Sequence, residues 1–322
     1  MSKRRISKQQ FARIEKKQQS YRQQQMTDEK GVTFEGLVIT RYLRHAHIED
    51  TQGNSIRCAI RPNIDSLVAG DHVVWQAEGT HQGIVVSRYP RQTELSRPDN
   101  QGHFRAIAAN ISQIMIVVAP IPEISWNLLD SYLVMTEYLK IPPYIVLNKT
   151  DLPCDTIQQT LLKYYEPLGY PLLFTNSADD QDKSLHKALN NQTSVFVGQS
   201  GVGKSSIIAK VLPHESSRIQ TGEVSAHSNL GCHTTSNSYL YHLPTGGELI
   251  DSPGVRELSL WNMSGTDIAR GYREFREYIP QCKYRNCTHY ETPGCAIIQA
   301  VKNKLISLKR YENYVKILQI SN

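Results

Sequence analysis

The chain contains the stretch Gly198-Gln199-Ser200-Gly201-Val202-Gly203-Lys204-Ser205, which has the spacing G-x-x-x-x-G-K-S. The apolar run at 194–197 enters it as a buried strand would, and the helical pattern at 206–212 leaves it. A phosphate-binding P-loop requires this strand–loop–helix context, because the glycines and the helix N-terminus turn backbone N–H groups toward an anion. We therefore expect residues 198–206, Ser206 included, to bind a nucleotide. Lys204 would reach the β- and γ-phosphates, and the Ser205 hydroxyl would ligate Mg²⁺.

A base-selecting motif lies upstream of the P-loop. Asn148-Lys149-Thr150-Asp151 has the spacing N-K-x-D and follows an apolar run at 144–147, at the end of a strand where α/β folds bind ligands. Asp151 would accept two hydrogen bonds from guanine, from N1–H and from the exocyclic amine, a donor pair that adenine lacks. Asn148 would contact the base or brace the P-loop, and Lys149 would lie over the base plane. Together with the P-loop, this motif predicts GTP as the nucleotide.

Further segments complete the predicted site. Ser177 and Ala178 follow a third strand and would offer a backbone N–H to guanine O6. The stretch 251–254 has the spacing D-x-x-G, so Asp251 would hold Mg²⁺ through a water and the Gly254 N–H would sense the γ-phosphate. The long polar segment between the P-loop and this motif contains two threonines, either of which could complete the Mg²⁺ shell; they are Thr234 and Thr235.

The order of these motifs is unusual, because N-K-x-D precedes the P-loop instead of following D-x-x-G. This is a circular permutation of a G domain, and it preserves the site because all the loops lie at one edge of the sheet. It also places Gly254 directly before the C-terminal region, so a nucleotide-driven shift could pass there. Val255 stands where many G proteins carry a water-orienting Gln, which predicts slow intrinsic hydrolysis. His233 is either a catalytic helper or a loop histidine without a role.

A cysteine cluster follows the G motifs. Cys282-x4-Cys287-x-His289-x5-Cys295 supplies three thiolates and one imidazole, which is a closed, structural zinc set. The alternative is a group of reduced, unliganded thiols. The same loop mixes charge with aromatic rings in Lys283-Tyr284-Arg285, a surface that suits RNA or is simply solvated.

Composition and patterning outline the domains. The chain has 322 residues and a net charge of +6, and no apolar run approaches the roughly 18 residues of a membrane span. Residues 1–25 contain eight Lys or Arg and one Glu, as in disordered arms that bind nucleic acid or only aid solubility. Short strands between 31 and 95 indicate a small β-barrel of OB type, which would suit RNA or be purely structural. Alternating strands and helices then indicate a parallel α/β sheet.

Taken together, these motifs resemble the ribosome small subunit-dependent GTPase A family, a bacterial family of circularly permuted GTPases. The resemblance covers nearly the whole chain and includes the permuted G motifs, the zinc loop, and the segments 70–75 (GDHVVW), 91–97 (RQTELSR) and 310–314 (RYENY). It implies a multidomain fold with four parts: a basic tail at 1–30, an OB domain at 31–95, a permuted GTPase domain at 96–265 and a helical zinc domain at 266–322.

The resemblance also implies a function. The expected protein is a cytoplasmic monomer that binds the small ribosomal subunit and its rRNA, acts in late subunit maturation, and hydrolyses GTP to GDP and phosphate with stimulation by the subunit. Two alternatives remain. One is an RNA-binding module that GTP regulates, with little turnover of its own. The other is a P-loop kinase or ATPase of small molecules, which the N-K-x-D motif opposes.

Overall fold

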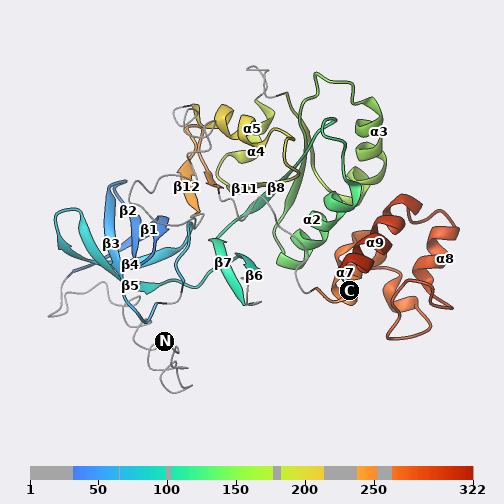
Figure 1. Cartoon of the computed structure of the whole chain (residues 1–322), viewed down its shortest axis with the longest axis horizontal. Coiled ribbons are helices and arrows are strands. Elements are labelled where there is room, and N and C mark those ends of the chain that lie inside the picture. The colour runs from blue at the N-terminus through green and yellow to red at the C-terminus, as the bar shows by residue number, and fades with distance from the viewer. Residues whose placement is uncertain are drawn as a thin grey trace. The chain divides into compact units, whose positions relative to one another are not determined.

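The computed structural model of the chain describes residues 32–64, 66–98, 103–176, 183–213, 238–251 and 263–321 (Figure 1). These residues form two compact units. The first contains the described residues up to Asn110 together with 238–241 and 250–251, and the second contains the rest. Among the described residues, no helix is long and apolar enough to cross a membrane.

The first unit is built on a closed barrel of five strands, blue to cyan in Figure 1. β1 pairs antiparallel with both β2 and β4, β3 pairs in parallel with β5, and β4 pairs antiparallel with β5, so the sheet closes in the order expected of an OB-type barrel. The strands are β1 (Thr33–Tyr42), β2 (His45–Asp50), β3 (Ser55–Ile60), β4 (His72–Gly79) and β5 (Gln82–Arg88). Their inward residues, including Val38, Ile48 and Val85, form one apolar core.

A hairpin of β6 (Glu94–Pro98) and β7 (Phe104–Ala109) follows the barrel, and a buried ion pair anchors the segment that leads into it. Asp71 is fully buried and accepts hydrogen bonds from Arg91 Nε at 2.7 Å and from Val68 N at 2.8 Å. Arg91 also bonds to Glu94, at the start of the hairpin, at 2.6 Å. Beside this pair Gly70 is needed, because its φ is +87° and an added Cβ would lie 2.2 Å from the Ala109 carbonyl oxygen. Short β12 (Tyr239–His242) adds to β1 through Tyr239 opposite Thr40.

The second unit contains a parallel sheet in the order β10-β9-β8-β11-β13, in which β13 takes part through its first two residues, Glu248 and Leu249. Its strands are β8 (Gln113–Val118), β9 (Pro143–Leu147), β10 (Leu172–Phe174), β11 (Thr193–Val197) and β13 (Glu248–Asp251). β8 is buried along its whole length, as its apolar sequence predicts for a central strand. The accompanying helices are α2 (Trp126–Leu139), α3 (Asp155–Tyr164), the short 3-10 helix η1 (Glu166–Leu168), α4 (Ser184–Leu189) and α5 (Lys204–Val211).

The C-terminal helices, red in Figure 1, pack around their own apolar core within the same unit. They are α7 (Gly265–Gly271), the 3-10 turns η4 (Arg273–Phe275) and η5 (Ile279–Gln281), α8 (Ala296–Lys302) and α9 (Leu308–Ser321). The sequence predicts helix from 268 to 278, but α7 ends at Gly271 and Tyr272 is extended. The core includes Ile268, Phe275 and Tyr314, together with Val134 from α2.

Candidate nucleotide-binding and metal sites

The P-loop connects β11 to α5, as the sequence predicts, and two of its glycines are required by close contacts. Gly198 has a φ of +141°, and an added Cβ would lie 2.2 Å from the Val117 carbonyl oxygen of β8. Gly203 has a φ of +94°, and an added Cβ would lie 2.3 Å from Nδ2 of Asn148. The loop is therefore seated against both the central strand and the N-K-x-D motif.

Lys204 is the first residue of α5 and is nearly buried, with 9% of its surface exposed. Its ammonium group donates hydrogen bonds to the carbonyl oxygens of Gly198 and Gln199, both at 2.6 Å. The positive charge thus lies inside the loop whose N–H groups would hold phosphates. Ser205 and Ser206 follow in the first turn of α5, where Ser206 is exposed and Ser205 is half-buried.

The N-K-x-D motif meets the P-loop at the carboxyl end of β9. Asn148 is fully buried, donates from Nδ2 to the Val202 carbonyl oxygen at 3.0 Å and accepts from Thr175 Oγ1 at 3.3 Å. Of the two roles considered for Asn148, this contact is the bracing one. Lys149 reaches the same loop, donating to Gly201 O at 2.7 Å and to Ile121 O at 2.8 Å. Asp151 is exposed, with its carboxylate available to a base.

Other predicted site residues are placed only in part. Asp251 is the last residue of β13 and is buried, with 6% of its surface exposed. Thr150 follows β9, where its N–H donates to the Thr175 carbonyl oxygen at 3.3 Å. The remaining predictions lie outside the described residues: Ser177, Ala178, His233, Thr234, Thr235 and Gly254.

The segment between β8 and α2 also contacts the P-loop, which the motifs do not show. The Ser125 N–H donates to Oε1 of Gln199 at 3.2 Å, and Pro122 lies next to Gly201, 3.5 Å from where a Cβ would stand. Gln199 occupies a variable position of the P-loop pattern, so no sequence signal identifies this contact.

The cysteine cluster forms a compact ligand set. The ligand atoms of Cys282, Cys287, His289 and Cys295 all lie within 4.8 Å of one another. Nδ1 of His289 is 3.5 Å from the Cys282 sulfur and 3.6 Å from the Cys295 sulfur. A tetrahedral zinc ion would hold such atoms roughly 3.5–3.8 Å apart. The Cys282 and Cys295 sulfurs are 4.0 Å apart, too far for a disulfide. The four residues therefore fit a structural zinc ion.

The environment of the cluster is suited to a metal. Burial lowers the pKa of His289, which keeps its imidazole in the neutral form that binds metals. Burial also raises the pKa of the Cys295 thiol to about 12, so zinc would have to displace that proton on binding. Helix α9 supports the loop: Tyr311 OH donates to the His289 carbonyl oxygen at 3.0 Å, and Tyr314 OH to that of Thr288 at 2.7 Å.

A P-loop braced by an N-K-x-D motif that precedes it in the chain defines a circularly permuted P-loop GTPase, a hydrolase that acts on GTP. The family model described as RsgA GTPase matches residues 88–261. The chain belongs to this family, as its motifs had indicated.

Relatives and solved structures agree with the assignment. A protein of Haemophilus influenzae (strain PittGG) is 46% identical over 298 residues, covering 90% of this chain and 85% of that protein. One of Pectobacterium carotovorum (strain PC1) is 44% identical over 335 residues, covering 99% and 95%. Both are named small ribosomal subunit biogenesis GTPase RsgA.

YjeQ from Thermotoga maritima superposes with a TM-score of 0.73 at 26% identity, covering 90% of this chain and 99% of YjeQ. YloQ, described as a circularly permuted GTPase, gives 0.71 at 27% identity, with coverage of 92% and 97%. The permuted fold with an N-terminal barrel and C-terminal helices is thus confirmed.

Proposed function

We propose that this protein binds the small ribosomal subunit during its late maturation and hydrolyses GTP to GDP and phosphate there, with the subunit stimulating turnover. The observation that carries the proposal is the contact of Asn148 with Val202 and Gly203, which joins the base-selecting motif to the phosphate loop. The names of the curated relatives supply the ribosomal context.

In this proposal each motif has one task. Asp151 selects guanine, with Lys149 over the base plane and Thr150, Ser177 and Ala178 around the base. Residues 198–206 hold the phosphates with their N–H groups, and Lys204 neutralises the β- and γ-phosphates. Bound Mg²⁺ would balance phosphate charge and would be held by Ser205, Asp251 and one of Thr234 and Thr235. The Gly254 N–H senses the γ-phosphate, and His233 assists hydrolysis.

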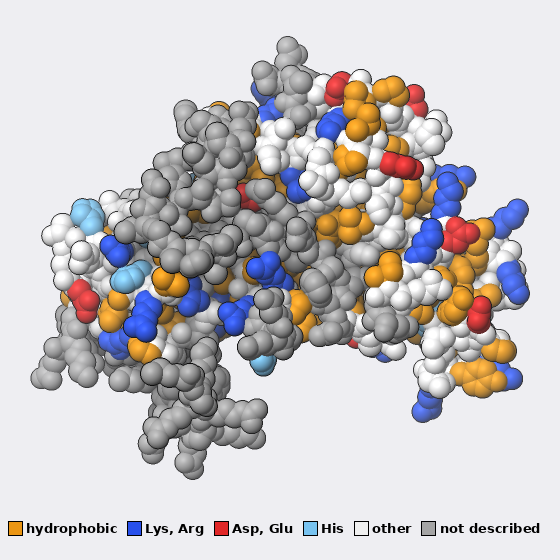
Figure 2. Space-filling model, viewed as in Figure 1, with side chains coloured by type: hydrophobic (Ala, Val, Ile, Leu, Met, Phe, Trp, Pro, Cys, Tyr) orange, Lys and Arg blue, Asp and Glu red, His pale blue; other side chains and the backbone are white. Residues whose placement is uncertain are grey.

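Surface charge favours an RNA partner. The barrel and its hairpin carry four exposed arginines, Arg44, Arg57, Arg97 and Arg105. Figure 2 shows Lys and Arg side chains, in blue, on the face of the molecule that it presents. The zinc loop exposes a second mixed surface with Lys283, Tyr284 and Arg285, in which the Lys283 ammonium lies 5.4 Å from the centroid of the Tyr284 ring. Guanidinium groups and aromatic rings recognise phosphates and unstacked bases, so both surfaces suit rRNA.

The remaining parts follow from this function. Zinc would be structural, because all four ligand positions come from the protein and leave none open for a substrate. The domain boundaries stay predictions: a basic tail at 1–30, an OB domain at 31–95, a GTPase domain at 96–265 and a zinc domain at 266–322. The cytoplasmic location and the monomeric state also stay predictions.

The decisive experiment measures GTP turnover of the pure protein with and without small ribosomal subunits, at two salt concentrations. We expect slow turnover alone, a large stimulation by subunits, and a stimulation that weakens steeply with salt because phosphate contacts release counterions. Asp151→Ala should reduce the preference for GTP over ATP by at least about a hundredfold, because it removes the acceptor for both guanine donors. Negligible turnover with subunits present would instead support an RNA-binding module that GTP regulates.

A further inference from the structure

Helix α2 contacts both β8 of the parallel sheet and the C-terminal helices. Its residues from Leu129 to Thr136 are buried except for Ser131, so the helix is covered on nearly every side. Val134 is part of the core of the C-terminal helices. Gly271 of α7 lies directly against it, since an added Cβ would be 2.6 Å from Val134 Cγ1 and 2.9 Å from its Cα. α2 and α7 therefore touch at backbone distance, and neither can shift without the other.

A buried ion cluster pins the middle of α2 to the C-terminal helices. Asp130 has no exposed surface and accepts hydrogen bonds from Arg310 Nη1 and, at 2.8 Å, from Asn313 Nδ2, both on α9. Tyr165 OH, at the end of α3, donates to the same carboxylate at 3.0 Å. Arg310 is only 2% exposed. Its Nε and Nη2 donate to the two carboxylate oxygens of Glu274 at 2.7 and 3.1 Å.

The cluster is enclosed by aromatic rings from both sides of the junction. The Arg310 guanidinium lies 4.9 Å from the Tyr165 ring centroid and 4.7 Å from that of Tyr272, so one ring comes from each side of the junction. Burial opposes the charge on Arg310, but Asp130 and Glu274 outweigh it and raise its pKa well above the usual value. A buried charge that loses its partner is strongly destabilising, so the helices stay in register.

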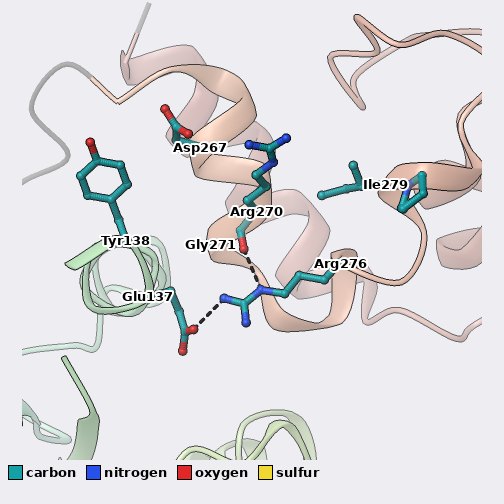
Figure 3. A pocket seen from close by; sticks show the side chains of 8 residues that line it. Glu137, Tyr138, Asp267, Arg270, Gly271, Arg276 and Ile279 are labelled. Carbon is teal, nitrogen blue, oxygen red and sulfur yellow. Dashed lines mark hydrogen bonds and ion pairs between the residues drawn. The ribbon is translucent and has the colours of Figure 1, made fainter. Parts of the chain in front are cut away.

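The C-terminal end of α2 is held as well. Glu137 binds Arg273 Nε and Arg276 Nη2, both at 2.6 Å. Figure 3 shows the Arg276 contact at the wall of an open pocket of about 520 Å³, where Arg276 Nε also donates to the Arg270 carbonyl oxygen at 2.9 Å. The C-terminal helices thus bind α2 at its middle, through Asp130, and at its C-terminal end, through Glu137.

The other end of α2 reaches the P-loop. Ser125 immediately precedes α2, and its N–H holds Gln199. Lys149 ties Ile121, on the same connecting segment, to Gly201. On the far side, α9 carries Tyr311 and Tyr314, which hold the zinc loop. Contacts therefore run without a break from the zinc loop through α9 and α2 to the phosphate loop.

We propose that α2 couples the C-terminal domain to the nucleotide site, with Asp130 and Arg310 as positioning residues for GTP binding. The inference rests on the P-loop being the nucleotide site, as proposed above, and goes beyond it by assigning a route that avoids the D-x-x-G segment. Because packed interiors transmit displacement, a change in the C-terminal domain shifts Ser125 and Gln199 through α2. By linkage, nucleotide binding must in turn stabilise the C-terminal helices.

The test uses two near-isosteric variants of the full-length protein. Asp130→Asn keeps the shape of the side chain and removes its charge, and Arg310→Lys keeps the charge but cannot make the paired contacts with Glu274. We expect each to raise the dissociation constant for fluorescent GDP and the KM for GTP by about 3- to 30-fold, with kcat at saturating GTP changed by less than about twofold. The exposed neighbour Lys309→Met is the matched control and should bind like the wild type.

The outcomes separate the hypotheses. A purely structural cluster would lower Tm and leave the GDP dissociation constant unchanged, and that result overturns the inference. Failure of the wild type to bind GTP would overturn the proposed function, and this inference with it. Should the variants not fold, hydrogen exchange of the wild type decides: GDP should slow exchange in residues 308–321, and identical profiles with and without GDP would overturn the coupling.

Discussion

The contact between Gly203 and Asn148 allows a quantitative test of how the two nucleotide motifs fit together. Gly201 and Gly203 have similar backbone conformations, with φ values of +84° and +94°, so an alanine at either position carries a similar strain of about 1–2 kcal/mol. Their surroundings differ. A Cβ at 201 would stand 3.5 Å from Pro122, an ordinary contact, whereas at 203 it would stand 2.3 Å from Asn148 Nδ2.

Asn148 cannot easily move, because it is fully buried and bonded to Val202 and Thr175. Overpacking of this kind costs a further 1–3 kcal/mol or so, which gives about 2–5 kcal/mol in total for Gly203→Ala. Urea denaturation of the nucleotide-free protein should therefore show Gly203→Ala to be less stable than Gly201→Ala by about 1–3 kcal/mol.

A double-mutant cycle identifies the cause. Asn148→Ala removes the amide that the new methyl group would meet, so Gly203→Ala should cost less in the Asn148→Ala background than in the wild type. Equal losses for Gly201→Ala and Gly203→Ala, or additive losses in the cycle, would refute the claim that the base-selecting motif buttresses the P-loop.

Three further predictions follow from the described contacts. Cys287→Ser should lower the zinc content of the purified protein, and a chelator should remove one zinc ion per chain from the wild type. Both changes should lower Tm, because folding and metal binding are linked. Metal analysis and thermal unfolding check this, and unchanged zinc content would contradict it. Arg91→Met should destabilise the barrel because it removes the shorter of the two ion pairs of the buried Asp71 carboxylate, which keeps Arg88 at 3.6 Å and the Val68 N–H. The loss should stay below the roughly 3–5 kcal/mol of a fully unpaired buried charge, and the double variant with Asp71→Asn should recover part of it. Equal stability of the single and double variants would be inconsistent with this pairing. Lys204→Ala should abolish measurable GTP turnover while leaving the circular dichroism spectrum unchanged, and turnover near that of the wild type would exclude Lys204 from the phosphate site.

The sequence predicts the strands and loops that combine strong periodicity with a motif. The apolar runs at 144–147 and 194–197 correspond to β9 and β11, each of which begins one residue earlier, and the P-loop lies between a strand and a helix as expected. Strand β2 has no apolar run that would predict it by itself, because only Ala46 and Ile48 point inward in an otherwise polar stretch. The hairpin of β6 and β7 has no such signal either, since its pairing depends on partners that no local pattern specifies.

The C-terminal helices show the limits of local patterns more clearly. Periodicity predicts one charged helix from 268 to 278, but α7 ends at Gly271, where a Cβ would clash with Val134. The segment 310–314 contributes to the family resemblance without revealing a role. In the structure Arg310 and Asn313 bind Asp130, 180 and 183 residues away in the chain. Such a partner cannot be found by spacing, because only the folded chain brings it near.

The chemistry of this junction bears on why it is ionic. An apolar cluster of the same volume would pack α9 against α2 with comparable stability, so stability alone does not account for the charges. The Asp130–Arg310–Glu274 cluster adds a penalty for sliding, because a slide that separates the pairs leaves a buried charge without its partner. The permuted order makes such a fixed junction useful. The D-x-x-G motif already leads into the C-terminal helices through the chain itself, and α2 returns from those helices to the P-loop through packing. The C-terminal domain is thereby joined to the proposed nucleotide site by the chain and by packing, which is the arrangement expected of a domain that reports whether GTP is bound.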